Sequence, residues 1–396
     1  MNKYNIGVGG LKITKFEKKL VNKVLDSNRL SYGDMTRKCE REFARLHESK
    51  FAIFTNSGTS CLQIAIAALK EKYHWKEGDE IIVPATTFIA TPNTVIYNNM
   101  KPVFVDVNPK TFNIDTSKIE EKITKKTRAI LPVHLLGLPA DMDKIIEIAK
   151  KYNLKIIEDS AETMFAKYKS KSVGSFGDIG CFSTYVAHYI VTGVGGLCTT
   201  SDSELAIILR SLANHGRDAI YINIDDDNKK TGTQFKEIIA RRFNFVRYGF
   251  SYRCTEMEAA LGLGQLRRKD SIIKRRKEIA NSYIKGLEDL SDYIGFQETP
   301  KDVENVYMLF GIILRKGSKM DLITYLEKNG IETRDLLPLV DQPIYNKYFK
   351  DKEKHYPVAT FLSKHAFYIG CHQYISNKEI KYIIKTFHNY FNMVKS

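Results

Sequence analysis

The stretch KFAIFTNSGTSCLQIAIAALKEKY, from Lys50 to Tyr73, decides how the first half of the chain is interpreted. Residues 50–56 form an apolar, strand-like run, and residues 59–73 have the character of a helix. Between them lies the segment Ser57-Gly58-Thr59-Ser60, in which hydroxyl groups and a glycine meet the start of the helix. The free N–H groups of a helix start can hold a phosphate. Taken alone, however, this segment is more simply an N-cap with a tight turn.

Strand-like and helix-like segments alternate from this stretch to about residue 200. The further predicted strands are 80–85, 102–107, 128–136 and 155–160, and the further predicted helices are 91–99, 117–124 and 141–153. In the last helix, the spacing i, i+3, i+4 and i+7 predicts a buried stripe of Met142, Ile145, Ile146 and Ala149. The strands are continuous apolar runs, which favours an α/β fold whose mostly parallel sheet lies between helices. Ligands of such sheets bind at the carboxyl ends of the strands.

The second half of the chain predicts a smaller unit. A helix at about 203–214 ends near Gly216, and the polar residues that follow predict a mobile surface insertion at about 222–236. We therefore expect a large domain over 1–254 with a short N-terminal arm, a long connecting helix over 255–290, and a small α+β C-terminal domain over 291–396. The small domain has a predicted strand at 308–314 and predicted helices at 320–330 and 377–391.

The net charge of +15 is attractive to phosphorylated molecules of any size. The lysines are spread over the whole chain, and the densest basic segments, 240–247 and 266–277, are interpreted as solvated helix faces. We therefore predict no nucleic-acid partner. No apolar run reaches the roughly 20 residues of a membrane-spanning helix, and the first residues lack a signal-peptide pattern. The sequence thus predicts a cytoplasmic protein without a membrane partner.

The cysteines lie at positions 39, 61, 181, 198, 254 and 371, far from one another in sequence. None of them forms a CxxC or CxC pair, so the spacing of zinc and iron–sulfur ligands is missing. We predict no metal site and interpret all of these residues as buried free thiols.

Several polar residues stand where predicted strands end. Asp159 follows an apolar strand, and a carboxylate at that point either caps the next element or can keep a pyridinium nitrogen protonated. Phe88 follows another strand and could lie against a ring, while Ser183 could add a hydroxyl to a phosphate site. His188 lies in CFSTYVAHYIVTGVGGLCTT, residues 181–200, where strand-like residues pass into a glycine-rich bend. Each of these features alone is also compatible with a purely structural role.

Together and in this order, a set of segments resembles the pyridoxal-phosphate-dependent sugar aminotransferase and dehydratase family, the DegT/StrS group. The segments are TNSGTSCLQIAIAAL, PATTFIATPNTV, PVFVDVNPKTFNID, EDSAET, GSFGDIGCFSTY, TGVGG, LANHGRD, YGFSYRCTEMEAALGLGQL, GIETRDLLPLVDQPIY and FYIGCHQ. The resemblance covers the chain from about residue 10 to its end. It implies the aspartate aminotransferase-like fold (PLP fold type I), a homodimer with shared active sites, and a pyridoxal 5'-phosphate or pyridoxamine 5'-phosphate cofactor.

The resemblance also implies roles for individual residues. Ser57, Gly58, Thr59 and Ser183 would hold the cofactor phosphate, Phe88 would stack on its ring, and Asp159 would pair with the ring nitrogen. In the family, a residue of a GYNYR motif reaches the phosphate from the partner subunit. The corresponding segment here is GFSYR, with the shorter Ser251 in place of asparagine.

The main departure from the family is His188, which stands where the aminotransferases carry the lysine that forms a Schiff base with the cofactor. An imidazole cannot form a stable Schiff base, but it can transfer protons near neutral pH. Glu162 likewise replaces a common glutamine. Both changes, together with CHQ at 371–373 and His215 in NHG, resemble the sugar 3-dehydratases of the group, those that act on GDP-4-keto-6-deoxymannose.

The resemblance therefore implies removal of the 3-hydroxyl from a nucleotide-linked 4-keto-6-deoxysugar, with His188 as acid and base. Glu162 and His215 would assist, and L-glutamate would be the amino donor that restores the cofactor. Arg334 could bind a carboxylate or phosphate, or form a surface ion pair.

Three alternatives remain at this point. One is an aminotransferase that uses the histidine as its proton carrier or places its Schiff-base lysine elsewhere, at Lys167 or Lys169. Another is a catalytically inactive protein that binds the cofactor or a nucleotide sugar as a sensor. The third is an engineered replacement of an original lysine, which the unusual neighbours Glu162 and CHQ argue against.

Overall fold

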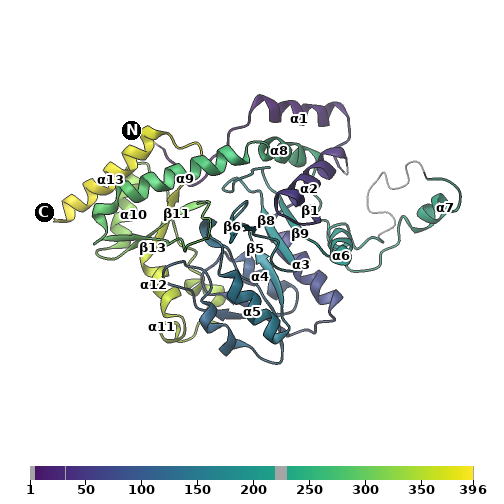
Figure 1. Cartoon of the computed structure of the whole chain (residues 1–396), viewed down its shortest axis with the longest axis horizontal. Helices are drawn as coiled ribbons and strands as arrows, with labels where there is room; N and C mark the ends of the chain where they lie inside the picture. The colour runs from purple at the N-terminus through teal and green to yellow at the C-terminus, as the bar shows by residue number, and fades with distance from the viewer. Residues whose placement is uncertain (1–4, 32, 219–229, 396) are drawn as a thin grey trace.

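A seven-stranded sheet forms the centre of the larger part of the molecule, and its strand order is β1-β9-β8-β5-β4-β2-β3. The computed structural model describes residues 5–31, 33–218 and 230–395 (Figure 1). The strands are β1 (Phe51–Thr55), β2 (Glu80–Pro84), β3 (Lys101–Val105), β4 (Thr127–Ile130), β5 (Lys155–Asp159), β8 (Ile179–Ser183) and β9 (Gly196–Thr200). Only β9 runs antiparallel to its neighbours, β1 and β8. The prediction of a mostly parallel sheet is confirmed.

Helices pack against both faces of this sheet, which explains why its strands are apolar throughout. Along β2, Ile81 and Val83 belong to one buried cluster and Ile82 belongs to another. Successive side chains of a strand point to opposite faces, so a strand covered on both sides must be apolar at every position. The helices of this part are α2 (Asp34–Leu46), α3 (Gly58–Lys72), α4 (Ala90–Tyr97), α5 (Met142–Tyr152) and α6 (Ser203–Ala213).

The buried stripe predicted on α5 is largely confirmed. Met142, Ile145 and Ala149 are buried, whereas Ile146 is only half-buried and Ile148 is buried in addition. The side chain of Asp141 accepts a hydrogen bond from the backbone N–H of Lys144 and so caps the helix. The buried face of α5 is therefore turned toward Ile148 relative to the predicted one.

Three predictions for this part of the chain differ in the structure. The strand predicted at 128–136 is only β4, which ends at Ile130, and residues 135–137 form a 3-10 turn instead. Residues 117–124 do not form an α-helix but two 3-10 turns, η1 (Thr116–Lys118) and η2 (Glu120–Lys122), because Ile119 is their only fully buried anchor before the chain enters β4. The strand-like residues around His188 form a loop between β8 and β9. These residues are apolar because the side chains of Tyr189, Ile190 and Val191, within the loop, are buried.

The C-terminal part contains a four-stranded antiparallel sheet in the order β10-β11-β13-β12. Its strands are β10 (Ile294–Phe296), β11 (Leu309–Leu314), β12 (Thr333–Asp335) and β13 (Ala366–Gly370). Its helices are α10 (Lys319–Lys328), η5 (Leu339–Asp341), η6 (Pro343–Tyr345), α11 (Lys352–His355), α12 (Pro357–His365) and α13 (Asn377–Lys395). The sheet, α10 and α13 enclose a separate buried cluster that includes Phe310 and Phe387, whereas the buried apolar residues of η5, η6 and α12 belong to the cluster of the large sheet.

The stretch 255–290 was expected to be one long helix, but the structure divides it. It contains α8 (Glu256–Leu266), α9 (Lys269–Gly286) and η4 (Glu288–Leu290), and α1 (Lys15–Asp26) packs on α8. In Figure 1, α9 runs along the top of the molecule from α8 to α13. Since α9 packs on α13, this helix carries the chain from the large sheet to the small one.

The expected mobile insertion at 222–236 lies partly outside the described residues. Within the described part, α7 (Gly232–Arg241) is helical and stands away from α6 at one end of the molecule (Figure 1). A short hairpin of β6 (Lys167–Tyr168) and β7 (Lys171–Ser172) and the 3-10 turn η3 (Leu135–Gly137) complete the elements.

The N-terminal arm crosses to the small sheet. Ile6 pairs with Ile331, and the backbone N–H of Val8 donates to Oε2 of Glu332 at 2.7 Å. All six cysteines are buried and free, as predicted. Within the described ranges, we find no helix that is both long and apolar enough to cross a membrane.

Candidate active site

A cavity of about 450 Å³ lies at the carboxyl ends of β1, β2, β5 and β8. Its far wall comes from the C-terminal part, through residues such as Met308, Leu337 and Tyr368. Eight residues singled out in the sequence line this cavity: Ser57, Gly58, Thr59, Phe88, Asp159, Glu162, Ser183 and His188. Segments far apart in the chain are thus brought to one place by the parallel arrangement of the strands.

The turn between β1 and α3 has the form of an anion cradle. Ser57 is the N-cap of α3, and its Oγ accepts from the backbone N–H of Ser60 at 3.0 Å. The first N–H groups of a helix have no acceptor within the helix. A Cβ atom at Gly58 would lie only 2.8 Å from Cβ of Ser183. Glycine is therefore required for the hydroxyl of Ser183 to approach the helix start, which suits a phosphate.

Asp159 is a buried carboxylate held by two neutral donors. Its side chain is 5% exposed and accepts from Oγ1 of Thr91 at 2.8 Å and from the backbone N–H of Ala161 at 3.2 Å. Burial raises the pKa of Asp159, and these hydrogen bonds only partly oppose the effect. A protonated ring nitrogen is the kind of partner that would restore the charge of this carboxylate.

His188 presents a neutral imidazole to the cavity. Its Nδ1 atom is buried and has no hydrogen-bond partner among the described residues. Burial, followed by the positive charge of Arg276, lowers the pKa of His188 to about 3. The residue therefore stands as an unprotonated base with one ring nitrogen free.

Glu162 has a pKa that is shifted upward, in the direction opposite to that of His188. Burial raises its pKa to about 7, against the hydrogen bond from the backbone N–H of Leu136 to Oε2 at 2.9 Å, and the charge of Asp159 adds to the rise. At pH 7 the cavity thus holds one unprotonated base and one acid that is about half protonated. Such a separation of pKa values is the usual basis of paired acid and base roles.

The aromatic residues of the cavity include some that the sequence did not single out. Phe88 is 57% exposed although it is a large apolar side chain, so one of its faces is open to a ligand ring. Tyr185 and Tyr368 also line the cavity, as does Val8 of the N-terminal arm. Tyr368 and Val8 belong to segments far from the strand ends, and no local pattern in the sequence marks them.

No lysine is found among the described residues that line the cavity. Lys167 and Lys169, weighed above as substitutes for the missing lysine, are both exposed at the β6–β7 hairpin. They form ion pairs with Glu48 and Asp143, respectively. Neither lysine therefore reaches the cofactor cavity of its own chain.

Three other predicted residues lie outside the cavity. His215 and Ser251 are exposed on adjoining segments, which are linked by a bridge between Asn214 and Ser251. Arg334 forms an ion pair with Glu332, and its side chain is more than half exposed. The structure of one chain thus brings none of the three to the cofactor cradle.

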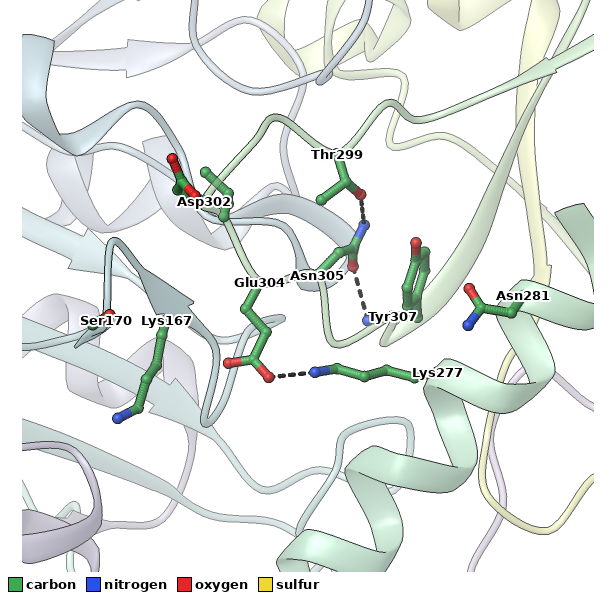
Figure 2. Close-up of a pocket in the computed structure, with 10 residues that line it drawn as sticks. Lys167, Ser170, Lys277, Asn281, Thr299, Asp302, Glu304, Asn305 and Tyr307 are labelled. Atoms are coloured by element: carbon green, nitrogen blue, oxygen red, sulfur yellow. Dashed lines mark hydrogen bonds and ion pairs between the residues drawn. The ribbon is translucent and has the colours of Figure 1, made fainter.

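A second cavity, of about 490 Å³, lies beside α9 and is strongly polar (Figure 2). Figure 2 shows Lys277 reaching from α9 to Glu304, with which it forms an ion pair. The amide of Asn305 bonds to Thr299 at 3.3 Å and to the backbone N–H of Tyr307 at 2.9 Å. Lys277 and Glu304 satisfy each other, and the other carboxylate of this cavity, on Asp302, is exposed to solvent, unlike the buried Asp159 of the first cavity.

Comparison with known proteins agrees with the site. A profile of the DegT/DnrJ/EryC1/StrS aminotransferase family matches residues 11–388. The chain belongs to this family. It is 34% identical over 383 residues to GDP-perosamine synthase of Escherichia coli O157:H7, covering 96% of this chain and 97% of the relative. It is 33% identical over 390 residues to GDP-4-keto-6-deoxy-D-mannose 3-dehydratase of Yersinia pseudotuberculosis, covering 95% and 94%.

The fold is likewise similar to that of a solved relative. A GDP-4-keto-6-deoxymannose-3-dehydratase with a trapped PLP-glutamate geminal diamine has a TM-score of 0.85 and 29% identity, over 96% of this chain and 100% of that one. The aminotransferase fold type I is therefore shown, and pyridoxal phosphate is the cofactor of this enzyme. The relatives include both a synthase and a dehydratase, so similarity alone does not choose the reaction.

Proposed function

We propose that the chain is a dehydratase that uses pyridoxamine or pyridoxal 5'-phosphate to remove the 3-hydroxyl of a nucleotide-linked 4-keto-6-deoxysugar. The observation that carries the proposal is a cofactor cavity lined by His188 and, over its described residues, by no lysine. A lysine would bind the aldehyde form of the cofactor covalently after each cycle. A histidine leaves the cofactor free and retains only the ability to move protons.

The cofactor would be held by groups already arranged for it. The start of α3, with Ser57, Gly58 and Thr59, and the hydroxyl of Ser183 would bind the phosphate. Phe88 would cover one face of the ring, and Asp159 would keep the ring nitrogen protonated. Held in this way as the amine, the cofactor would supply an electron sink and the nitrogen that condenses with the sugar ketone; overall, the amine form would become the aldehyde form, and that nitrogen would be released as ammonia.

His188 would move the proton in the elimination. Its neutral imidazole would take up a proton from the acidic C–H group of the cofactor, next to the nitrogen that condenses with the sugar. The resulting imidazolium would then donate a proton to the oxygen of the departing 3-hydroxyl. Glu162, in the protonated form that predominates below about pH 7, would donate a hydrogen bond within the same cavity. The sugar loses one oxygen in the overall reaction.

L-Glutamate is the proposed amino donor that returns the cofactor to its amine form. The solved dehydratase relative was trapped with PLP and glutamate, which supports this choice. The relative named as a GDP-perosamine synthase supports transamination of a similar sugar as the second candidate function.

We also propose a homodimer in which Ser251 and His215 complete the site of the partner subunit. Both residues are exposed and lie outside the cavity of their own chain. The neighbouring segment carries exposed apolar side chains, among them Phe243 at 78% and Tyr248 fully exposed. Apolar side chains exposed to this degree are typical of a surface that a partner covers.

The dimer proposal is tested by mixing two inactive variants, His188→Asn and the double variant Ser251→Gly, His215→Ala. If the sites are shared, mixed dimers contain one intact site and activity returns. If each chain completes its own site, every chain in a mixed dimer still has a defective site. Mixing His188→Asn with the double variant then restores no activity.

The reaction is tested with pyridoxamine phosphate and a panel of nucleotide-linked 4-keto-6-deoxysugars, by measuring ammonia and the mass of the sugar product. Loss of one oxygen with release of ammonia is the expected result. A sugar product that has gained an amino group would instead support the second candidate function, transamination. Tight cofactor binding without turnover of any sugar would instead indicate the inactive sensor.

A further inference from the structure

Arg276 is the largest fully buried side chain among the described residues, although it belongs to the basic segment 266–277 that was interpreted as a solvated helix face. That interpretation is wrong for Arg276, whose side chain is 1% exposed. The interpretation as a solvated helix face holds better for the neighbouring residues. Arg275 donates to the backbone carbonyl of Ile375, and Lys277 forms an ion pair with Glu304 (Figure 2).

The guanidinium of Arg276 is bound by neutral acceptors on several segments. Its Nη2 donates to the backbone carbonyl of His188 at 3.3 Å, and its Nη1 donates to the carbonyl of Met308 at 2.7 Å. Its Nε donates to Oε1 of Gln373, in the CHQ segment, at 3.0 Å. The guanidinium also lies 4.7 Å from the centre of the Tyr189 ring.

Within the part of the chain that the structure describes, no carboxylate forms an ion pair with Arg276. A buried charge without a counter-ion is costly, and apolar residues of similar volume are often at least as stable. Burial accordingly lowers the pKa of the guanidinium. The stability of the fold alone therefore gives little reason to keep an arginine at this position.

We propose that Arg276 is a positioning residue for His188: its guanidinium fixes the loop from which the imidazole projects and places a permanent positive charge behind the ring. The bond to Met308 fixes the opposite wall as well, since Met308 also lines the cavity. The proposal rests on the proposed function only in naming His188 as the group that moves the proton.

The charge has a direct consequence for the imidazole. Arg276 favours the neutral form of His188, and it is the main charged contributor to that preference after burial. The titratable groups that line the cavity together with His188 are Asp159 at the end of β5, Glu162 just after it, Tyr185 of the same loop and Tyr368 of β13. Arg276 is the only charged group among the described residues that contributes to lowering the pKa of His188.

Three variants separate position from charge. Arg276→Lys keeps the charge but loses the forked bonds, and Arg276→Gln loses the charge. Arg275→Gln is the matched control, since Arg275 precedes Arg276 on α9 and also donates to a backbone carbonyl near the CHQ segment. Each variant is titrated by histidine NMR in the full chain without cofactor, with His188→Asn assigning the signal, and kcat, KM and cofactor affinity are measured in the loaded enzyme.

In Arg276→Gln, the His188 signal is expected to move toward its protonated form at a higher pH than in Arg275→Gln. In Arg276→Lys it is expected to follow the control. Both Arg276 variants should lose about 10- to 100-fold in kcat, with KM and cofactor affinity within about twofold, because Arg276 does not line the cavity.

Equal His188 titrations in Arg276→Gln and Arg275→Gln would overturn the role of the charge, and unchanged kcat in Arg276→Lys would overturn the role of the bonds. If Arg276→Gln does not fold, Gln373→Leu removes the acceptor of Nε, and kcat unchanged in that variant contradicts the positioning role. The titration requires no substrate, so its result is independent of whether the enzyme dehydrates or transaminates.

Discussion

The cavity beside α9 and the cavity at the strand ends differ in how their ionisable groups are satisfied. In the cavity beside α9, Lys277 and Glu304 pair with each other near the surface. In the cavity at the strand ends, Asp159, Glu162 and His188 are held by neutral groups or by none, and the pKa of each is displaced from its ordinary value. Displaced pKa values in a cleft are characteristic of catalytic sites.

The difference shows that cavity size alone is a poor guide to function. Both cavities are of similar volume, about 490 Å³ and 450 Å³. Only the cavity at the strand ends joins an anion cradle, an exposed aromatic face and acids and bases without an ion-pair partner among the described residues. The following variants test this comparison by removing groups from each cavity in turn.

The largest effect is expected from His188→Asn. Asparagine keeps the approximate size of the side chain but cannot exchange a proton, so turnover should fall by about 10³-fold. Cofactor affinity should stay within about twofold, because the cradle of α3 is untouched. Sugar product is measured at saturating substrate. A variant that retains more than a tenth of wild-type turnover would exclude His188 as the proton carrier.

A smaller loss, about 10²-fold in kcat, is expected from Asp159→Asn, since a neutral amide cannot stabilise a protonated ring nitrogen. The absorbance of the bound cofactor should change with the protonation of its ring. Thr91→Val is the control that removes one hydrogen bond to Asp159 and leaves the charge. Equal losses in the two variants would show that the carboxylate acts only through packing.

The pH profile should depend on Glu162. Since its pKa is raised to about 7, the residue carries its proton below that pH and loses it as the pH rises through that value. Activity that requires the protonated form should therefore decline above about pH 7. Glu162→Gln cannot lose a proton and should remove this alkaline decline. A profile of kcat/KM with the same alkaline limb in both proteins would assign the limb to another group.

The smallest effect is expected in the cavity beside α9. Lys277→Met with Glu304→Gln removes a partly exposed ion pair, and such pairs contribute about 0–1 kcal/mol. Urea unfolding should change by no more than that, and kcat and KM should not change. A tenfold loss of activity in this double variant would mean that the second cavity takes part in the reaction.

Much of the fold follows from local patterns in the sequence. β1, β2 and β5 are predicted to within a residue or two because both of their faces are buried, which leaves a continuous apolar run bounded by polar turns. The segment 117–124 misleads because its charges and helix-forming residues suit a helix, while the chain must turn into β4 within a few residues. Local propensity gives way there to the demands of the sheet.

The site was predictable where it follows strand ends and not where it comes from distant segments. Asp159 and Ser183 end β5 and β8, so the rule for parallel sheets locates them. Tyr368 belongs to a strand of the C-terminal sheet, and Arg276 lies within a basic run whose composition suggests exposure. Charge patterning cannot tell which cation of such a run turns inward, because that depends on tertiary contacts.

The central claim is that the cofactor cavity holds pyridoxal phosphate without a covalent bond to the chain. The most direct test is to saturate the full-length protein with pyridoxal phosphate, reduce it with borohydride, denature it and measure its intact mass, with any modified peptide then identified. The account predicts the mass of the unmodified chain, because no lysine among the described residues lines the cavity. A reduced cofactor adduct on a lysine peptide, at one equivalent per chain, would contradict it.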